Sequence, residues 1–259
     1  MRSFLTIAAA VMIMLIFRVL AFTVYAVEDN GIAPLLEHGD RVIVNRWSYG
    51  LRTGGGGIFR YERWIRQRPE RGELLAFNSP IDTLHDIRSR AVCAGYFEAG
   101  AGDTVTIGGK PMAVPGRCRP VKVEPWNIKL LCNTYRMHER RKTDIRDGKL
   151  YVDGQETRYA WFRQDYCWVS NHGDSRVPDS RYFGFVPDSH IIGRIVMIAY
   201  SAGGSTPFDG TLREDRCMKL LPRRHIVIHG KGKKIRGNGV KPRQEARHKD
   251  DKETHEKGI

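Results

Sequence analysis

The chain has 259 residues, 41% of them hydrophobic, and a formal net charge of +14; this length suffices for a membrane anchor, a domain of ordinary size and a tail. Five cysteines without a CxxC pair argue against a zinc site and leave open either one or two disulfides or buried free thiols. Residues 222–259 hold 12 Lys and Arg against 5 Asp and Glu, half of the net charge. We expect no metal, because of the cysteine spacing, no nucleic acid partner, because no nucleic-acid-binding motif accompanies that charge, and no cofactor.

The amino-terminal segment is predicted to span a membrane. Residues 3–26 form an apolar run that only Arg18 interrupts, and a spanning helix needs roughly 20 residues. The run reaches that length if Arg18 extends towards the interface. It is long for a signal peptide, and no small-x-small cleavage site follows it, so we expect an uncleaved anchor at 1–27. Arg2 favours an inside amino terminus, which would place the main domain on the extracytoplasmic side of a single-pass cell-membrane protein.

Residues 28–202 are predicted to form a mainly β domain. Short runs rich in Val, Ile and aromatic residues, bounded by turn residues, recur along this stretch at 40–47, 72–79, 103–107, 149–154 and 190–200. The dipeptides Asp147-Gly148 and Asp153-Gly154 predict hairpin turns. A helix is expected only within residues 128–146.

The carboxyl-terminal part, residues 203–259, is predicted to be a basic, disordered tail. It has few apolar residues and many charges, so it cannot bury enough surface to offset the loss of chain entropy. A basic tail beside a bilayer can also contact anionic lipid, which we treat as a hypothesis.

Four blocks of the chain resemble one known family. The stretches NGIAPLLEHGDRVIVNRWSYGLR at 30–52 and GDSRVPDSRYFGFVPDSHIIGR at 173–194 carry most of the likeness, with RGELLAF at 71–77 and SRAVCAGYFEAGAGD at 89–103 between them. In this order they resemble signal peptidase I, a membrane-bound serine endopeptidase that cuts signal peptides from exported preproteins. The resemblance covers roughly residues 5–201.

The resemblance implies a fold and a set of partners. The family has a mostly β-sheet catalytic region with a smaller β region inserted, which here would be residues 104–165. An apolar surface beside the family's cleft is thought to enter the lipid bilayer. Signal peptides of preproteins bind as an added strand.

The family's catalytic serine and lysine are not found at the matching positions. Aligned on Pro34, the nucleophile position is Gly31, which has no side chain, and the lysine position is Ser89. A shift of one residue would offer Arg88 or Arg90, and a guanidinium does not lose its proton to serve as a base. The resemblance therefore implies a member without the dyad.

The last block keeps part of its supporting residues. Asp179, Ser180 and Arg181 match the family's DSR element, which we expect to support the site through a charge-assisted pair. Asp174 lies in a GDSR element displaced by two residues, and Val177 stands where the family has a serine. Side chains considered as replacements for the dyad are Ser48, Ser89, Ser170, His172 and Asp174, whereas Glu37 and His38 are expected to be surface turn residues.

Three functions are consistent with these patterns. The first is a membrane-bound, catalytically impaired homologue that binds signal peptides or assists an active signal peptidase. The alternative is an active serine endopeptidase with a rearranged catalytic set. The third is an anchored module with an unrelated partner.

Overall fold

The computed structural model describes residues 6–7, 10–12, 14, 21–27, 32, 34–53, 62–64, 67–87, 89–171, 178–202 and 212–224. All of them belong to one compact unit, residues 1–227. Most of the predicted tail and most of the predicted anchor lie outside the described residues. The described part of the chain contains no helix that is both long and apolar enough to cross a membrane.

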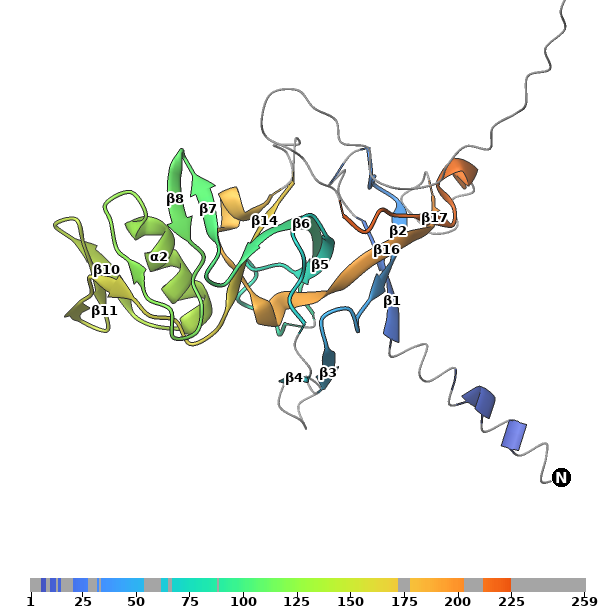
Figure 1. The fold of residues 1–259 in the computed structure, drawn as a ribbon, viewed down its shortest axis with the longest axis horizontal. Coiled ribbons are helices and arrows are strands. Elements are labelled where there is room, and N and C mark those ends of the chain that lie inside the picture. The colour runs from blue at the N-terminus through green and yellow to red at the C-terminus, as the bar shows by residue number, and fades with distance from the viewer. Residues whose placement is uncertain are drawn as a thin grey trace, which may run out of the picture. The chain divides into compact units, whose positions relative to one another are not determined.

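An antiparallel sheet forms the centre of this unit and confirms the prediction of a mainly β domain (Figure 1). Its strands, in spatial order, are β1 (Phe22–Ala26), β2 (Asp40–Asn45), β16 (Ile191–Ser201), β5 (Leu74–Asn78), β6 (Val92–Gly100), β14 (Tyr166–Ser170) and β15 (Val186–Pro187). The pairing register of β16 shifts against both β2 and β5. Such bulges bend a strand and raise its twist, which explains why this sheet curls.

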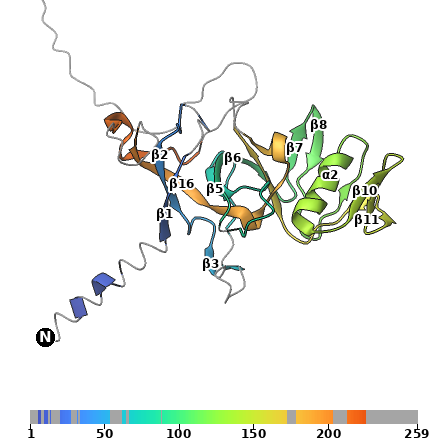
Figure 2. The same cartoon turned by 180° about the vertical axis from the view of Figure 1, so that it is seen from behind.

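The strand β5 is buried along its whole length because the sheet is covered on both faces. Leu74 and Ala76 pack into one apolar cluster with Val42 and Ile195, whereas Leu75 and Phe77 pack into a second cluster with Val169 and Phe183. A short continuous apolar run such as LLAF is typical of a strand in this position. Viewed from behind, β5 and β6 lie between β16 and β14 (Figure 2).

Between β6 and β14 the chain forms a smaller set of elements with its own apolar cluster. These are β7 (Thr104–Ile107), β8 (Lys110–Ala113), β9 (Val121–Lys122), α2 (Ile128–Thr134), the π-helix η1 (Tyr135–Glu139), β10 (Thr143–Arg146), β11 (Lys149–Val152), β12 (Gln155–Glu156) and β13 (Tyr159–Ala160). The predicted helix is thus present but ends early, because Arg140 takes the left-handed conformation and β10 follows. Figure 1 shows α2 beside β10 and β11.

Both predicted hairpin turns are confirmed. Asp147 and Gly148 have positive φ angles between β10 and β11, and Asp153 and Gly154 have them between β11 and β12. Two positive φ angles in a row are the requirement of the two-residue turn that Asp-Gly favours. Short elements complete the fold: β3 (Leu51–Thr53), β4 (Glu62–Trp64), α3 (Ser180–Phe183), the 3-10 turns η2 (Asp188–His190) and η3 (Glu214–Arg216), and β17 (Lys219–Leu220).

Both ends of the domain differ from the boundaries that the sequence suggested. The predicted anchor helix through Ala26 is wrong at its end, because residues 22–26 form β1 and pair with β2. Residues 22–26 continue the apolar run on which the helix was predicted, and hydrophobicity alone does not distinguish a strand from a helix there. At the other end, ordered structure continues beyond residue 202, since η3 and β17 follow and β17 pairs with β16.

Candidate functional site

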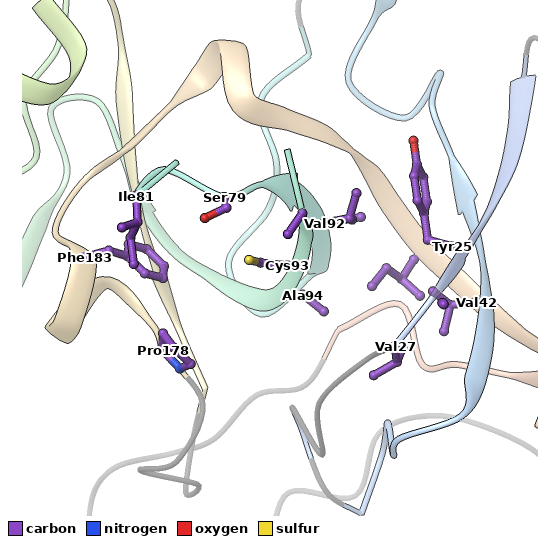
Figure 3. Close-up of a pocket in the computed structure, with 14 residues that line it drawn as sticks. Tyr25, Val27, Val42, Ser79, Ile81, Val92, Cys93, Ala94, Pro178 and Phe183 are labelled. Carbon is purple, nitrogen blue, oxygen red and sulfur yellow. The ribbon is translucent and has the colours of Figure 1, made fainter. Parts of the chain in front are cut away.

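An apolar pocket opens beside the central sheet (Figure 3). Its volume is about 140 Å³, close to the roughly 150 Å³ of an engineered apolar cavity that takes up benzene. The pocket therefore has room for one small or medium apolar side chain. It is lined by Tyr25, Ala26, Val27, Val42, Ala76, Ser79, Ile81, Ala91, Val92, Cys93, Ala94, Pro178, Phe183 and Ile195.

Two unpaired strand edges border this pocket. Among the described strands, β1 pairs only with β2, and residues 92–95 of β6 pair only with β5. Tyr25, on the first edge, lines one side of the pocket, and Val92 and Cys93, on the second, line its middle (Figure 3). An unpaired edge offers backbone N–H and C=O groups to an extended peptide, and the pocket beside it can take a side chain. The arrangement suits a ligand in the form of a strand.

A third wall of the pocket comes from α3, and the predicted DSR element fixes it there. The buried Ser180 accepts a hydrogen bond from the backbone N–H of Val169 at 2.9 Å. Asp179, also buried, caps α3 by accepting from the backbone N–H of Arg181, and it accepts from the N–H of Asn171 as well. These bonds hold α3 against β14, which places Pro178 and Phe183 at the pocket.

The Asp179–Arg181 pair is charge-assisted. The guanidinium of Arg181 donates to the Asp179 carboxylate at 2.8 to 3.0 Å, and its own side chain is largely exposed. Asp174, the other predicted supporting residue, lies outside the described residues, as does His172. Among the described residues, Asp179 and Ser180 hold α3 against β14 through these hydrogen bonds.

The loop between Ile81 and Ala91 carries the lysine position of the resemblance. Ser89 is exposed in a turn, where its backbone N–H donates to the Asp86 carbonyl at 2.8 Å. Asp82 holds the other half of the loop by accepting from the backbone N–H of His85 and from its ring Nδ1, the latter at 2.9 Å. Because both ends of this loop line the pocket, Ser89 lies two residues from the pocket wall.

The nucleophile position, Gly31, lies outside the described residues, but the turn that follows it is described. The backbone N–H groups of Leu35 and Leu36 both donate to the carbonyl of Ile32, whose side chain is buried in the sheet's core. Pro34 is exposed. These two bonds thus tie Leu35 and Leu36 to Ile32.

Other side chains that the sequence suggested are placed as follows. Ser48 has a buried hydroxyl oxygen without a hydrogen-bond partner among the described residues, and Ser170 is buried in β14. Glu37 pairs with Arg213 and Arg216, and His38 is exposed. None of the five cysteines, all of which lie among the described residues, forms a disulfide, and Cys93 lines the pocket.

A pair of histidines, buried His190 and half-buried His138, was not revealed by the sequence and lies beside Arg90 of the Ser89 loop. The rings of His138 and His190 are 5.7 Å apart. His190 donates from Nδ1 to the Asn78 carbonyl, which leaves Nε2 facing Arg90 at 3.5 Å. Burial, and then the charge of Arg90, lower the pKa of His138 to about 4. His138 is therefore neutral at pH 7.

This shift predicts a pH dependence of stability. An unfolded His138 binds a proton below its ordinary pKa of 6.5, whereas the folded protein resists protonation until about pH 4. The free energy of unfolding should therefore have its full value above pH 6.5, where His138 is neutral in both states. It should fall by up to about 3 kcal/mol as pH drops towards 4. Urea unfolding at several pH values should show this slope in the native chain and lose it in His138→Gln. The exposed histidine variant His85→Gln should keep it; equal slopes in all three would contradict the assignment.

Comparisons with known proteins agree with the resemblance. The family model described as signal peptidase, peptidase S26, matches residues 1–200. A curated signal peptidase I of Bacillus caldolyticus is 25% identical over 187 residues, which is 72% of this chain and 84% of that protein.

Proposed function

The chain belongs to the signal peptidase family, peptidase S26, and we propose that it binds the signal peptides of exported preproteins without cutting them. The observation that carries this proposal is the apolar pocket between two unpaired strand edges. Membership implies preproteins with signal peptides as ligands. The proposal separates the recognition of such a peptide from its hydrolysis.

The pocket supports recognition of a small apolar side chain. A peptide that pairs with the edge of β1 or of β6 gains backbone hydrogen bonds, and its alternate side chains point towards one face. With about 140 Å³ available, the pocket suits the small residues of a small-x-small segment. Alanines at 26, 76, 91 and 94 line it and keep it wide.

The chemistry of peptide cleavage lacks its two usual groups. Gly31 offers no hydroxyl as a nucleophile. A serine such as Ser89 cannot replace a lysine as general base, because its hydroxyl does not accept a proton near neutral pH. Arg90 donates from Nε to the His85 carbonyl and stays charged. The geometry therefore favours binding over hydrolysis.

We also propose that the chain is anchored in the cell membrane with its sheet domain on the extracytoplasmic side. An exposed apolar row supports this placement, since the strand register aligns Val24, Ile43, Met197 and Leu220 across four strands. Val24 and Leu220 are 51% and 77% exposed. β1 occupies the last residues of the predicted anchor, at 22–26, so this face would lie near the bilayer. A topology reporter fused after Arg52 should report the extracytoplasmic side; a cytoplasmic result would contradict the placement.

A substitution that fills the pocket tests the proposed function. Ala94→Phe should weaken binding of a fluorescent signal peptide by the full chain in detergent by at least about tenfold, because a lost apolar contact of 1.4 kcal/mol or more is tenfold in affinity. Fluorescence anisotropy measures the affinity, and circular dichroism checks the fold.

The matched control is Ala113→Phe. Ala113 is an exposed residue of β8 and is not among the residues that line the pocket. It should leave the affinity unchanged. The proposed function would be contradicted if the native chain bound no peptide, or if the native chain and Ala94→Phe bound it with equal affinity.

A rearranged catalytic set is the second candidate, and one observation favours it. Asp82 and His85 form a carboxylate–histidine pair in the same loop as Ser89. An oriented histidine is the base half of a serine triad. If the native chain cuts a preprotein, His85→Ala should abolish the cut under this candidate.

A further inference from the structure

A short segment after the family-matching region holds the site's framework through charge. We call residues 212–224 the carboxyl-terminal strap. Each of its four arginines pairs with a carboxylate from an earlier part of the chain: Arg213 and Arg216 with Glu37 and Asp40, Arg223 with Glu73, and Arg224 with Glu70. The family match ends at residue 200, so the strap is a feature of this chain outside the matched region.

Arg216 is the most buried of these arginines. Its side chain is 7% exposed, and it donates to both oxygens of Asp40, whose side chain is fully buried. Ser201 donates to the same carboxylate at 2.6 Å. Burial alone would raise the pKa of Asp40, but the hydrogen bonds from Arg216 and Ser201 hold it below its ordinary value. The pair is therefore charged and well satisfied, as a buried ion pair must be.

Arg216 also holds the backbone that follows the nucleophile position. Its guanidinium donates to the carbonyl of Leu35 at 3.0 Å and to that of Pro34 at 3.3 Å. Glu37 accepts from the same guanidinium at 3.2 Å and from Arg213 at 2.9 Å. One side chain thus connects the start and the end of the loop at 34–40.

The far end of this loop reaches the pocket wall. The N–H of Val27 donates to the carbonyl of Asp40 at 2.9 Å, and the N–H of Gly39 donates to the carbonyl of Val27 at 3.2 Å. Gly39 has a φ of +89°, and a Cβ there would lie 2.1 Å from the carbonyl oxygen of Ala202. Only glycine fits so close an approach. Val27 itself lines the pocket.

We infer that the strap is a positioning element and that Arg216 fixes both the turn after Gly31 and the β1 wall of the peptide pocket. The inference rests on the proposed function where it is tested by peptide affinity. Its test by amide hydrogen exchange does not depend on peptide binding. It extends the site beyond the family's matched residues. Arg216 acts through Asp40 and the loop backbone and does not touch the peptide.

The test uses the full chain in detergent. Arg216→Ala should weaken signal-peptide binding by at least about tenfold, because the loop at 34–40 and the pocket residue Val27 lose the side chain that holds them. Added guanidinium ion at low millimolar concentration should restore binding, whereas sodium at equal ionic strength should not. Arg146→Ala, which removes an exposed arginine from a surface pair on β10, should change the affinity less than about twofold.

A second variant, Arg216→Lys, and a second measurement, hydrogen exchange, separate the role of Arg216 in the loop from a general loss of folding. Arg216→Lys keeps the charge and should fold, but one ammonium cannot reach all the acceptors, so its affinity should lie between the native chain and Arg216→Ala. Hydrogen exchange should show faster exchange of the amides of Val27, Leu35 and Gly39 in both variants. Unchanged exchange, or unchanged affinity despite faster exchange, would overturn the inference. If the native chain binds no peptide, the proposed function fails, and the exchange rates alone decide whether the strap holds the loop.

Discussion

The double replacement Gly31→Ser with Ser89→Lys is expected to gain cleavage of a small-x-small preprotein peptide, with activity that rises steeply with pH. Restoring a nucleophile and a base should exceed either single variant by roughly 10²–10⁴-fold, the usual contribution of general-base catalysis. Ser89 is exposed, so a lysine there should keep a pKa near about 10.4 rather than one lowered by burial. Cleavage should therefore increase about tenfold per pH unit from 7 to 10.

The single variants serve as controls for this gain. Gly31→Ser has a nucleophile without a base, and Ser89→Lys has a base without a nucleophile, so each should cut at least about 100-fold more slowly than the double variant. Liquid chromatography of the peptide products at several pH values measures the rate. A double variant inactive even at pH 10, or one whose rate does not change with pH, would contradict the assigned positions or the exposure of residue 89.

Replacing Asp40 by alanine is expected to produce the largest loss of stability. The carboxylate is fully buried and neutralises Arg216, which would be left as a buried charge without its main partner. Removing one member of a buried pair costs about 3–5 kcal/mol. Urea unfolding followed by circular dichroism measures the loss.

The matched control for this loss is Asp144→Ala. Asp144 pairs with Arg146 on the surface of β10, where both side chains are more than half exposed. Exposed pairs contribute about 0–1 kcal/mol, so this variant should be close to native. Equal losses for both variants would show that the Asp40–Arg216 contact has no special weight in the fold.

Much of the sheet could be predicted because its strands carry local signals. DRVIVN and LLAFN are apolar, β-branched or aromatic runs between turn residues, and both are strands. The strand β6, with the sequence VCAGYFEAG, gave no such signal because glycine, alanine and glutamate have low β propensity. It is held by its two neighbours, β5 and β14, which is tertiary information.

The part of the site that a sequence motif marks could be predicted, whereas the part that long-range contacts build could not. The DSR element indicated a role for Asp179 and Ser180 near the site, and the structure shows both beside a pocket wall. Arg216 lies 176 residues from Asp40 along the chain, and a charged segment such as 212–224 reads locally as solvated. Only the folded chain brings Arg216 and Arg223 to the buried carboxylates of Asp40 and Glu73.

The most direct test of binding without hydrolysis is one incubation of the full native chain, in detergent, with a preprotein that carries a small-x-small site. Mass spectrometry of the mixture measures cutting, and co-purification measures binding. We expect the preprotein to co-purify with the chain and to stay intact. A fragment cut after the small-x-small site, formed in proportion to the amount of native chain, would contradict the account.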